Sequence, residues 1–183
     1  MCWFNKKETQ KEKALVLLQK YVTEVSPLIN AQLRNGTADA NQVKLFDSLF
    51  ARNTLPTYLY RWTSSQKDIS LNTLLCDKAY VSCSVNVDDF INHVDGDDLT
   101  CYKIETNTDL ETINVNALLP AANDEGEYIL PRSMQLKVVS IKLFQQNEFN
   151  QFLKEVHCDI ISAKEMIELY NINSIRIVTA SIQ

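Results

Sequence analysis

The stretch DEGEYILPRSMQLKVV, residues 124–139, carries two glutamates one residue apart where a polar loop becomes strand-like. Glu125 and Glu127 close the loop PAANDEGE, and the apolar run YILP follows them directly. In an extended backbone, side chains two residues apart point to the same face. If Glu127 already lies on a strand, the two carboxylates can therefore act together. In a solvated loop, two glutamates would be ordinary surface residues without a special role.

The sequence around this stretch predicts a β-rich region. Past Pro56, short runs rich in β-branched and aromatic residues alternate with polar turns. We expect strands at 57–62, 78–85, 99–105, 112–118, 127–131, 135–144 and 174–182, and short helices at 87–94, 147–156 and 162–170.

The first fifty residues have helical periodicity instead. Residues 9–25 carry an apolar stripe at helical spacing, formed by Ala14, Leu17, Leu18, Tyr21, Val22 and Val25. Ser26 and Pro27 are typical of a helix start, with serine as the N-cap and proline at the first helical position. This second helix should stop near Gly36, and a third is expected over 38–52.

A helical segment followed by a run of strands indicates an α+β fold rather than alternating βαβ units. The length of 183 residues fits one domain. We therefore expect a single domain over 1–183, with a helical lobe at 1–52 and a β-rich core at 53–183.

Composition narrows the class of protein. A net charge of -5 gives no general basic field for nucleic acid, although it leaves a local basic patch and a nucleic-acid acceptor open. Five cysteines without a CxxC pair favour reduced thiols in a cytoplasm. No run approaches the ~20 apolar residues that a membrane span needs. We expect a monomer without a membrane partner, cytoplasmic or delivered into another cell without a conventional signal peptide.

Several common kinds of site are disfavoured. With 3 glycines, the chain has no Gly-rich phosphate loop of the P-loop or Rossmann kind. His93 and His157 are far apart, which argues against a histidine metal site or a Ser-His triad. The acidic run VDGDD, residues 94–98, lacks the rest of an EF-hand pattern. We expect no metal cofactor.

Three polar features stand on the expected strands. Arg61 ends the run YLYR, Ser82 and Ser84 alternate in YVSCSV, and Glu125 and Glu127 open EYILP. The two serines share one face of their strand because the side-chain period is two. Each feature alone suits a solvated strand position. Together, an arginine, a hydroxyl pair and a carboxylate pair describe a cleft built by three strands.

In this order the motifs resemble the arginine-serine-glutamate class of mono-ADP-ribosyltransferases, which includes clostridial-toxin-like, phage and vertebrate ecto-enzyme members. LYRW resembles the aromatic-arginine strand, YVSCSV the Ser-Thr-Ser strand with Cys83 in place of threonine, and EGEYILP the E-x-E turn. VDDFINHV resembles the helix that follows the serines. The resemblance covers residues 57–139 and implies a two-sheet β core of ADP-ribosyltransferase type, with NAD as co-substrate.

The resemblance also implies roles for residues. An arginine fork suits the NAD pyrophosphate, which we assign to Arg61. Glu127 would stabilise the oxocarbenium-like ribose as nicotinamide leaves, and Ser82 would hold Glu127 and the ribose in place. The remaining residues assigned to NAD binding are Tyr60, Trp62, Ser84 and Phe90. Trp62 replaces a commonly small residue, and Phe90 either packs in the core or borders the nicotinamide pocket.

The resemblance assigns Glu125 to the acceptor, which it would orient and deprotonate. A guanidinium, with a pKa above ~12, must be oriented and lose its proton as it attacks. By resemblance, E-x-E points to an arginine acceptor on a protein, whereas Q-x-E points to others. Two alternatives keep the same fold: a NAD glycohydrolase that transfers ADP-ribose to water, and a catalytically inactive interaction module.

Overall fold

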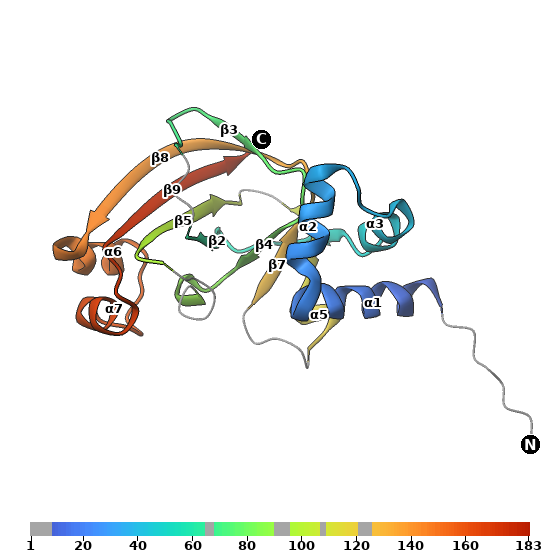
Figure 1. Ribbon diagram of the computed structural model, residues 1–183, viewed down its shortest axis with the longest axis horizontal. Coiled ribbons are helices and arrows are strands. Elements are labelled where there is room, and N and C mark those ends of the chain that lie inside the picture. The colour runs from blue at the N-terminus through green and yellow to red at the C-terminus, as the bar shows by residue number, and fades with distance from the viewer. Residues whose placement is uncertain (1–8, 65–67, 90–95, 107–108, 121–125) are drawn as a thin grey trace, which may run out of the picture.

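The computed structural model describes residues 9–64, 68–89, 96–106, 109–120 and 126–183. Figure 1 shows helices of the N-terminal part beside one end of a large, curved sheet, with two further helices, α6 and α7, at its other end. The α+β class is confirmed. Among the described helices, none is long and apolar enough to cross a membrane.

The helical lobe consists of α1 (Gln10–Lys20), a π-helical turn (Tyr21–Val25), α2 (Ser26–Asn35) and α3 (Ala40–Asp47). Thr9 and Glu12 form a capping box at the start of α1, and Gly36 ends α2 in the left-handed conformation that favours glycine. The expected N-cap at Ser26 is wrong. The π-helical turn carries the chain directly into α2, so Ser26 is already helical and Val25 occupies the N-cap position.

The third expected helix is shorter than its predicted range. Its N-cap is Asp39, whose side chain accepts a hydrogen bond from the Gln42 amide, and it ends at Asp47. The next residues form the edge strand β1 (Ala51–Asn53), paired with β6. Apolar periodicity could not show that the helix ends at Asp47, because residues 51–53 pair with β6, which is distant in the sequence.

In the described part of the chain, nine strands form a mixed sheet in the order β1-β6-β7-β4-β2-β5-β9-β8-β3. Beyond β1, their bounds are β2 (Tyr58–Thr63), β3 (Leu74–Cys76), β4 (Val81–Ser84), β5 (Asp98–Glu105), β6 (Leu110–Asn114), β7 (Glu127–Leu130), β8 (Gln135–Gln145) and β9 (Ser174–Ile182). The pair β5–β9 is parallel and the others are antiparallel. The two halves of the sheet meet between β4 and β2, at Tyr60 opposite Ser84.

Short helical segments join the strands: η2 (Val87–Asp89), α5 (Val115–Leu118), η3 (Gln146–Glu148), α6 (Phe149–Glu155) and α7 (Ala163–Tyr170). The predicted strand at 112–118 is correct only in its first half. Asn114 turns the chain into α5 because its side chain accepts a hydrogen bond from the Ala117 amide. The expected cap at Ser162 is confirmed, since its hydroxyl accepts from the Glu165 amide.

Three buried clusters hold these layers together. The cluster between the helical lobe and the sheet fixes the site described below, because burying large apolar side chains is the main stabilising term in folding. It contains Leu18, Tyr21, Phe46, Tyr80, Ile113, Val115 and Ile129. A second cluster lies between the sheet and α6 and α7, and a third lies around Leu59 and Cys83.

Candidate active site

Arg61 lies in the middle of β2 and is half-buried. Its Nη1 donates a hydrogen bond to the main-chain carbonyl of Ser82 at 2.9 Å. The arginine therefore bridges from β2 to β4 at the junction of the two halves of the sheet.

Both serines lie opposite β7, the strand that Glu127 opens. Ser82 pairs with Ile129, and Ser84 pairs with Glu127. Directly opposed residues of an antiparallel pair share one face, so the two hydroxyls and the Glu127 carboxylate start from the same face. Ser84 is 8% exposed and its Oγ accepts the Asn86 amide at 2.9 Å. The serine alternation predicted from the sequence is confirmed.

The hydroxyl of Tyr21, in the π-helical turn, joins the helical lobe to Ser82 of this group. It accepts a hydrogen bond from Asn30 Nδ2 at 3.0 Å and shares one with the Ser82 side chain. Burial raises the pKa of the Tyr21 phenol, and the Glu127 charge adds to this, while the two hydrogen bonds and the Arg61 charge oppose it. The pKa of this buried hydroxyl is therefore affected by a hydrogen bond with Ser82 and by the charges of Arg61 and Glu127.

The thiol of Cys83, on the other face of β4, is also affected by the charges of Arg61 and Glu127. Burial raises its pKa to about 12, with Arg61 lowering and Glu127 raising it. The thiol is therefore neutral at physiological pH. It packs with Leu59 and Leu130, so the residue that replaces the expected threonine fills the core rather than the site.

Among the described residues, Asn30 of α2 is a buried polar residue with an unpaired side-chain oxygen. It is 8% exposed, and its Oδ1 has no hydrogen-bond partner within the described part of the chain. A buried acceptor without a donor costs free energy, which a ligand donor would recover. Neither Asn30 nor Tyr21 was assigned to the site from the sequence, because Tyr21 lies on an apolar stripe and Asn30 stands inside a predicted helix.

Asp77, which directly follows β3, links this part of the chain to α2 of the lobe. It makes a two-point ion pair with Arg34, at 2.9 Å from Nε and 2.6 Å from Nη2. Burial pushes the pKa of Asp77 up, but Arg34, the Ala79 amide and the Arg61 charge outweigh it, so the pKa lies below its ordinary value. This carboxylate therefore anchors α2 to the segment that follows β3.

Tyr60 and Trp62 are placed differently from their neighbour Arg61. Adjacent residues in a strand point to opposite faces, and both rings pack against the cluster beneath α6 and α7. Trp62 donates from Nε1 to the Val87 carbonyl at 2.7 Å and meets Phe152 edge-on at 6.1 Å. The packing gives both rings a structural role, and their assignment to NAD binding stays a prediction.

Two predicted site residues, Glu125 and Phe90, lie outside the described residues. Within the described part of the chain, no group of three or more His, Cys, Asp or Glu side chains could hold a metal ion.

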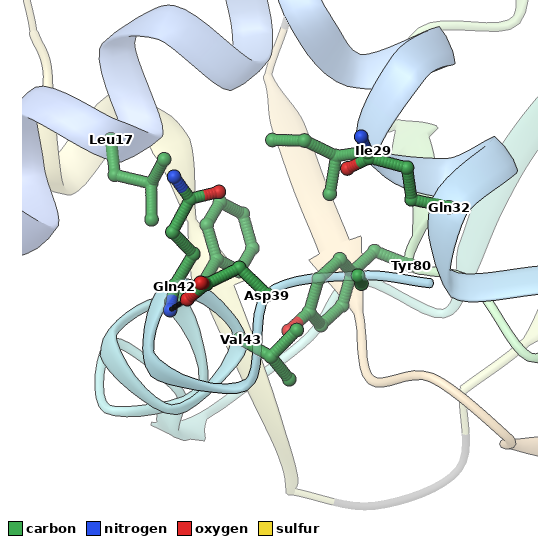
Figure 2. Close-up of a pocket in the computed structure, with 9 residues that line it drawn as sticks. Leu17, Ile29, Gln32, Asp39, Gln42, Val43 and Tyr80 are labelled. Atoms are coloured by element: carbon green, nitrogen blue, oxygen red, sulfur yellow. Dashed lines mark hydrogen bonds between the residues drawn. The ribbon is translucent and has the colours of Figure 1, made fainter. Parts of the chain in front are cut away.

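A separate small crevice lies within the helical lobe (Figure 2). Its enclosed space of about 10 Å³ is near the minimum for one water molecule. It is lined by Leu17, Ile29, Gln32, Ala38, Asp39, Gln42, Val43, Phe46 and Tyr80. It contains none of the predicted site residues and is far too small for a dinucleotide.

Comparison with solved structures shows which known proteins have a similar fold. The chain is similar to Plx2a, an ADP-ribosyltransferase toxin from Paenibacillus larvae (TM-score 0.58, 16% identity, 94% of this chain and 86% of that one). It is also similar to the ATR domain of Salmonella SpvB (TM-score 0.58, 14% identity, 93% and 98%). Exoenzyme S from Pseudomonas aeruginosa, crystallised with human 14-3-3 protein beta and carba-NAD, is similar as well (TM-score 0.57, 12% identity, 92% and 73%).

A scan against protein-family models and a search of curated protein sequences each gave no match. At these identities the structural similarity defines the fold. The chain therefore has the fold of the arginine-serine-glutamate mono-ADP-ribosyltransferase toxins, as the three motifs predicted.

Proposed function

We propose that this chain is a mono-ADP-ribosyltransferase that moves ADP-ribose from NAD to an arginine of an acceptor protein and releases nicotinamide. The observation that carries the proposal is the grouping of Arg61, Ser82 and Glu127 where β2, β4 and β7 lie side by side: Arg61 bonds to the Ser82 carbonyl, and Ser82 shares a face with Ser84, which pairs with Glu127. An arginine beside a carboxylate and a hydroxyl suits a substrate with both a pyrophosphate and a ribose.

Arg61 binds the pyrophosphate in this proposal. A guanidinium has five N–H donors in a rigid fork, so the bond from Nη1 to the Ser82 carbonyl fixes its plane and leaves donors for phosphate oxygens.

Glu127 supports departure of nicotinamide. The bond between the ribose C1′ and the nicotinamide nitrogen breaks, nicotinamide leaves with the bonding electrons, and positive charge develops on the ribose. A carboxylate beside that ribose stabilises the charge more than it stabilises the ground state. Ser82, in contact with Tyr21, positions the sugar.

The acceptor nitrogen then bonds to C1′ and gives up its proton. We assign the proton and the orientation of the acceptor to Glu125, on the basis of the motif. A NAD glycohydrolase would use the same steps with water as the nucleophile. The toxin fold of the similar structures also fits an effector that acts inside another cell.

The test incubates the protein with NAD labelled in the ADP-ribose part, together with an arginine-rich acceptor protein. Nicotinamide release and label on the acceptor are measured in the same tube, and mass spectrometry locates the modified residue. Glu127→Gln should lower both signals by roughly 10²–10³ while leaving the thermal midpoint unchanged.

Free ADP-ribose without acceptor label would identify a glycohydrolase. Failure of the native protein to consume NAD, with any acceptor, would leave the inactive interaction module.

A further inference from the structure

Glu127, the first residue of β7, pairs with β4 but not with β6, whose register with β7 begins at Tyr128. Its pair with Ser84 is the terminal pair of the β4–β7 ladder. The direction in which the carboxylate leaves the backbone therefore depends also on contacts beyond the ladder, and two of these act on the backbone at Gly126 and Glu127.

The first contact comes from α5. Asn116 Oδ1 accepts the Glu127 amide proton at 3.3 Å. The position of α5 is itself fixed, since Asn114 caps the Ala117 amide at 3.0 Å and donates from Nδ2 to the Tyr128 hydroxyl at 3.1 Å. Val115 between the two asparagines is fully buried. The segment Asn-Val-Asn thus binds the first two residues of β7.

The second contact is the close approach of Gly126 to Val85. Gly126 has φ +63°, and a Cβ built there would lie 2.3 Å from Val85 Cγ2. Its carbonyl accepts the Val85 amide at 3.2 Å. A side chain at this position would meet both an unfavourable backbone conformation and a steric clash, so glycine lets the turn lie directly against the end of β4.

We propose that Asn116 and Gly126 are positioning residues for Glu127, an inference that rests on the proposed function. Asn116 fixes the amide of the glutamate, and Gly126 fixes the peptide before it. Together they set the Cα–Cβ direction of Glu127 toward the hydroxyls of Ser82 and Tyr21. Neither residue is needed to touch NAD.

The test compares Asn116→Ala with Asn116→Asp. Alanine removes the acceptor, so kcat for nicotinamide release should fall about tenfold, the effect of roughly one hydrogen bond, while KM for NAD stays within about twofold. Aspartate keeps an acceptor oxygen and should restore most of kcat. Its negative charge beside Glu127 should raise the pKa of that carboxyl and move the acid limb of the pH profile upward.

Hydrogen exchange at the Glu127 amide provides a readout independent of catalysis. Exchange should be faster in Asn116→Ala and near native in Asn116→Asp. Asn150→Ala, at an exposed position of α6, serves as the matched control and should change neither quantity.

Gly126 is tested by relieving the clash. Gly126→Ala should lower kcat more than Asn116→Ala does, and the double variant Gly126→Ala/Val85→Ala should recover part of the loss because the Cγ2 contact is gone. Val85→Ala alone is the reference. A double variant as impaired as Gly126→Ala would overturn the role of close packing against Val85.

Two results separate this inference from the proposed function. Native protein that releases no nicotinamide, while Glu127 exchange responds as expected, would uphold the Asn116 contact and defeat the enzyme assignment. Active native protein whose Asn116→Ala variant keeps both kcat and amide protection would overturn the inference and leave the enzyme assignment standing.

Discussion

The strands that carry Arg61 and Glu127 are anchored in opposite ways. Arg61 stands inside β2, which pairs with β5 over six residues, and its neighbours Tyr60 and Trp62 are packed into the cluster under α6 and α7. Glu127 stands at the end of a four-residue strand and depends on polar contacts from Asn116 and on the absence of a side chain at Gly126.

The difference indicates how the two tasks are divided. A residue on a strand buried by large apolar side chains keeps its place through many weak contacts, so single substitutions nearby should move it little. A residue at a strand end has fewer ladder neighbours, so the loss of one hydrogen bond should move it more. We expect the pyrophosphate side of the site to be robust and the catalytic side to be sensitive to small changes.

The largest effect is expected on the catalytic side, at Glu125. Glu125→Gln should still bind NAD and release ADP-ribose to water, whereas transfer to arginine should fall by roughly 10²–10³, the scale of general acid–base catalysis. Nicotinamide release and acceptor label are measured on one preparation. Parallel loss of both would place Glu125 in NAD cleavage or in folding, and loss of neither would withdraw the arginine acceptor.

On the β2 side, Arg61→Lys replaces a planar fork by a point charge. NAD affinity should fall about tenfold or more, because charge-assisted bonds contribute roughly 1.5–3 kcal/mol each. Isothermal titration with NAD measures the loss, and the thermal midpoint should hardly move if β2 is as robust as its packing indicates. Native affinity in this variant would remove Arg61 from pyrophosphate binding.

Tyr21 joins the two sides, and Tyr21→Phe removes the shared hydroxyl. Asn30 Nδ2 then loses its partner, so the free energy of unfolding should fall by about 1–3 kcal/mol, together with a several-fold loss of nicotinamide release. Tyr80→Phe is the matched control: it removes a 2.6 Å bond to Asp47 in the same aromatic cluster, away from the site. Equal activity in the two variants would confine Tyr21 to stability.

The smallest effect concerns Asp77. Its pKa is lowered in the folded state, so its contribution to stability is present above the unfolded pKa of about 3.9 and is lost as pH falls through the folded value. Because the ion pair is partly exposed, we expect less than about 1 kcal/mol. The difference in unfolding free energy between native protein and Asp77→Asn should shrink below about pH 4.

The acid titration has its own control in Asp159→Asn, an exposed position before α7. A constant difference between native protein and Asp77→Asn down to pH 2 would mean that the ion pair with Arg34 does not titrate as described.

Several features could be predicted from local patterns. The stripe through Leu18 and Tyr21 predicted the helix that packs on the sheet, and the alternation of Ser82 and Ser84 predicted their common face. These are local properties, because side-chain direction repeats every 3.6 residues in a helix and every two in a strand. The errors, such as the helical ending of the strand predicted at 112–118, arose where side-chain capping or a distant strand overrode local preference.

The sequence by itself determined the α+β class, the order of the arginine, serine and glutamate motifs, and the common face of Ser82 and Ser84. It could not show which residues of other helices and strands these side chains contact. Only the tertiary structure decided that Tyr21 and Asn30 from the lobe join Ser82, that Arg61 bonds a carbonyl of β4, and that Asn116 and Gly126 hold Glu127. Periodicity reports burial within one segment, whereas these contacts join residues far apart in the chain, whose encounter is set by the packing of the whole sheet and lobe.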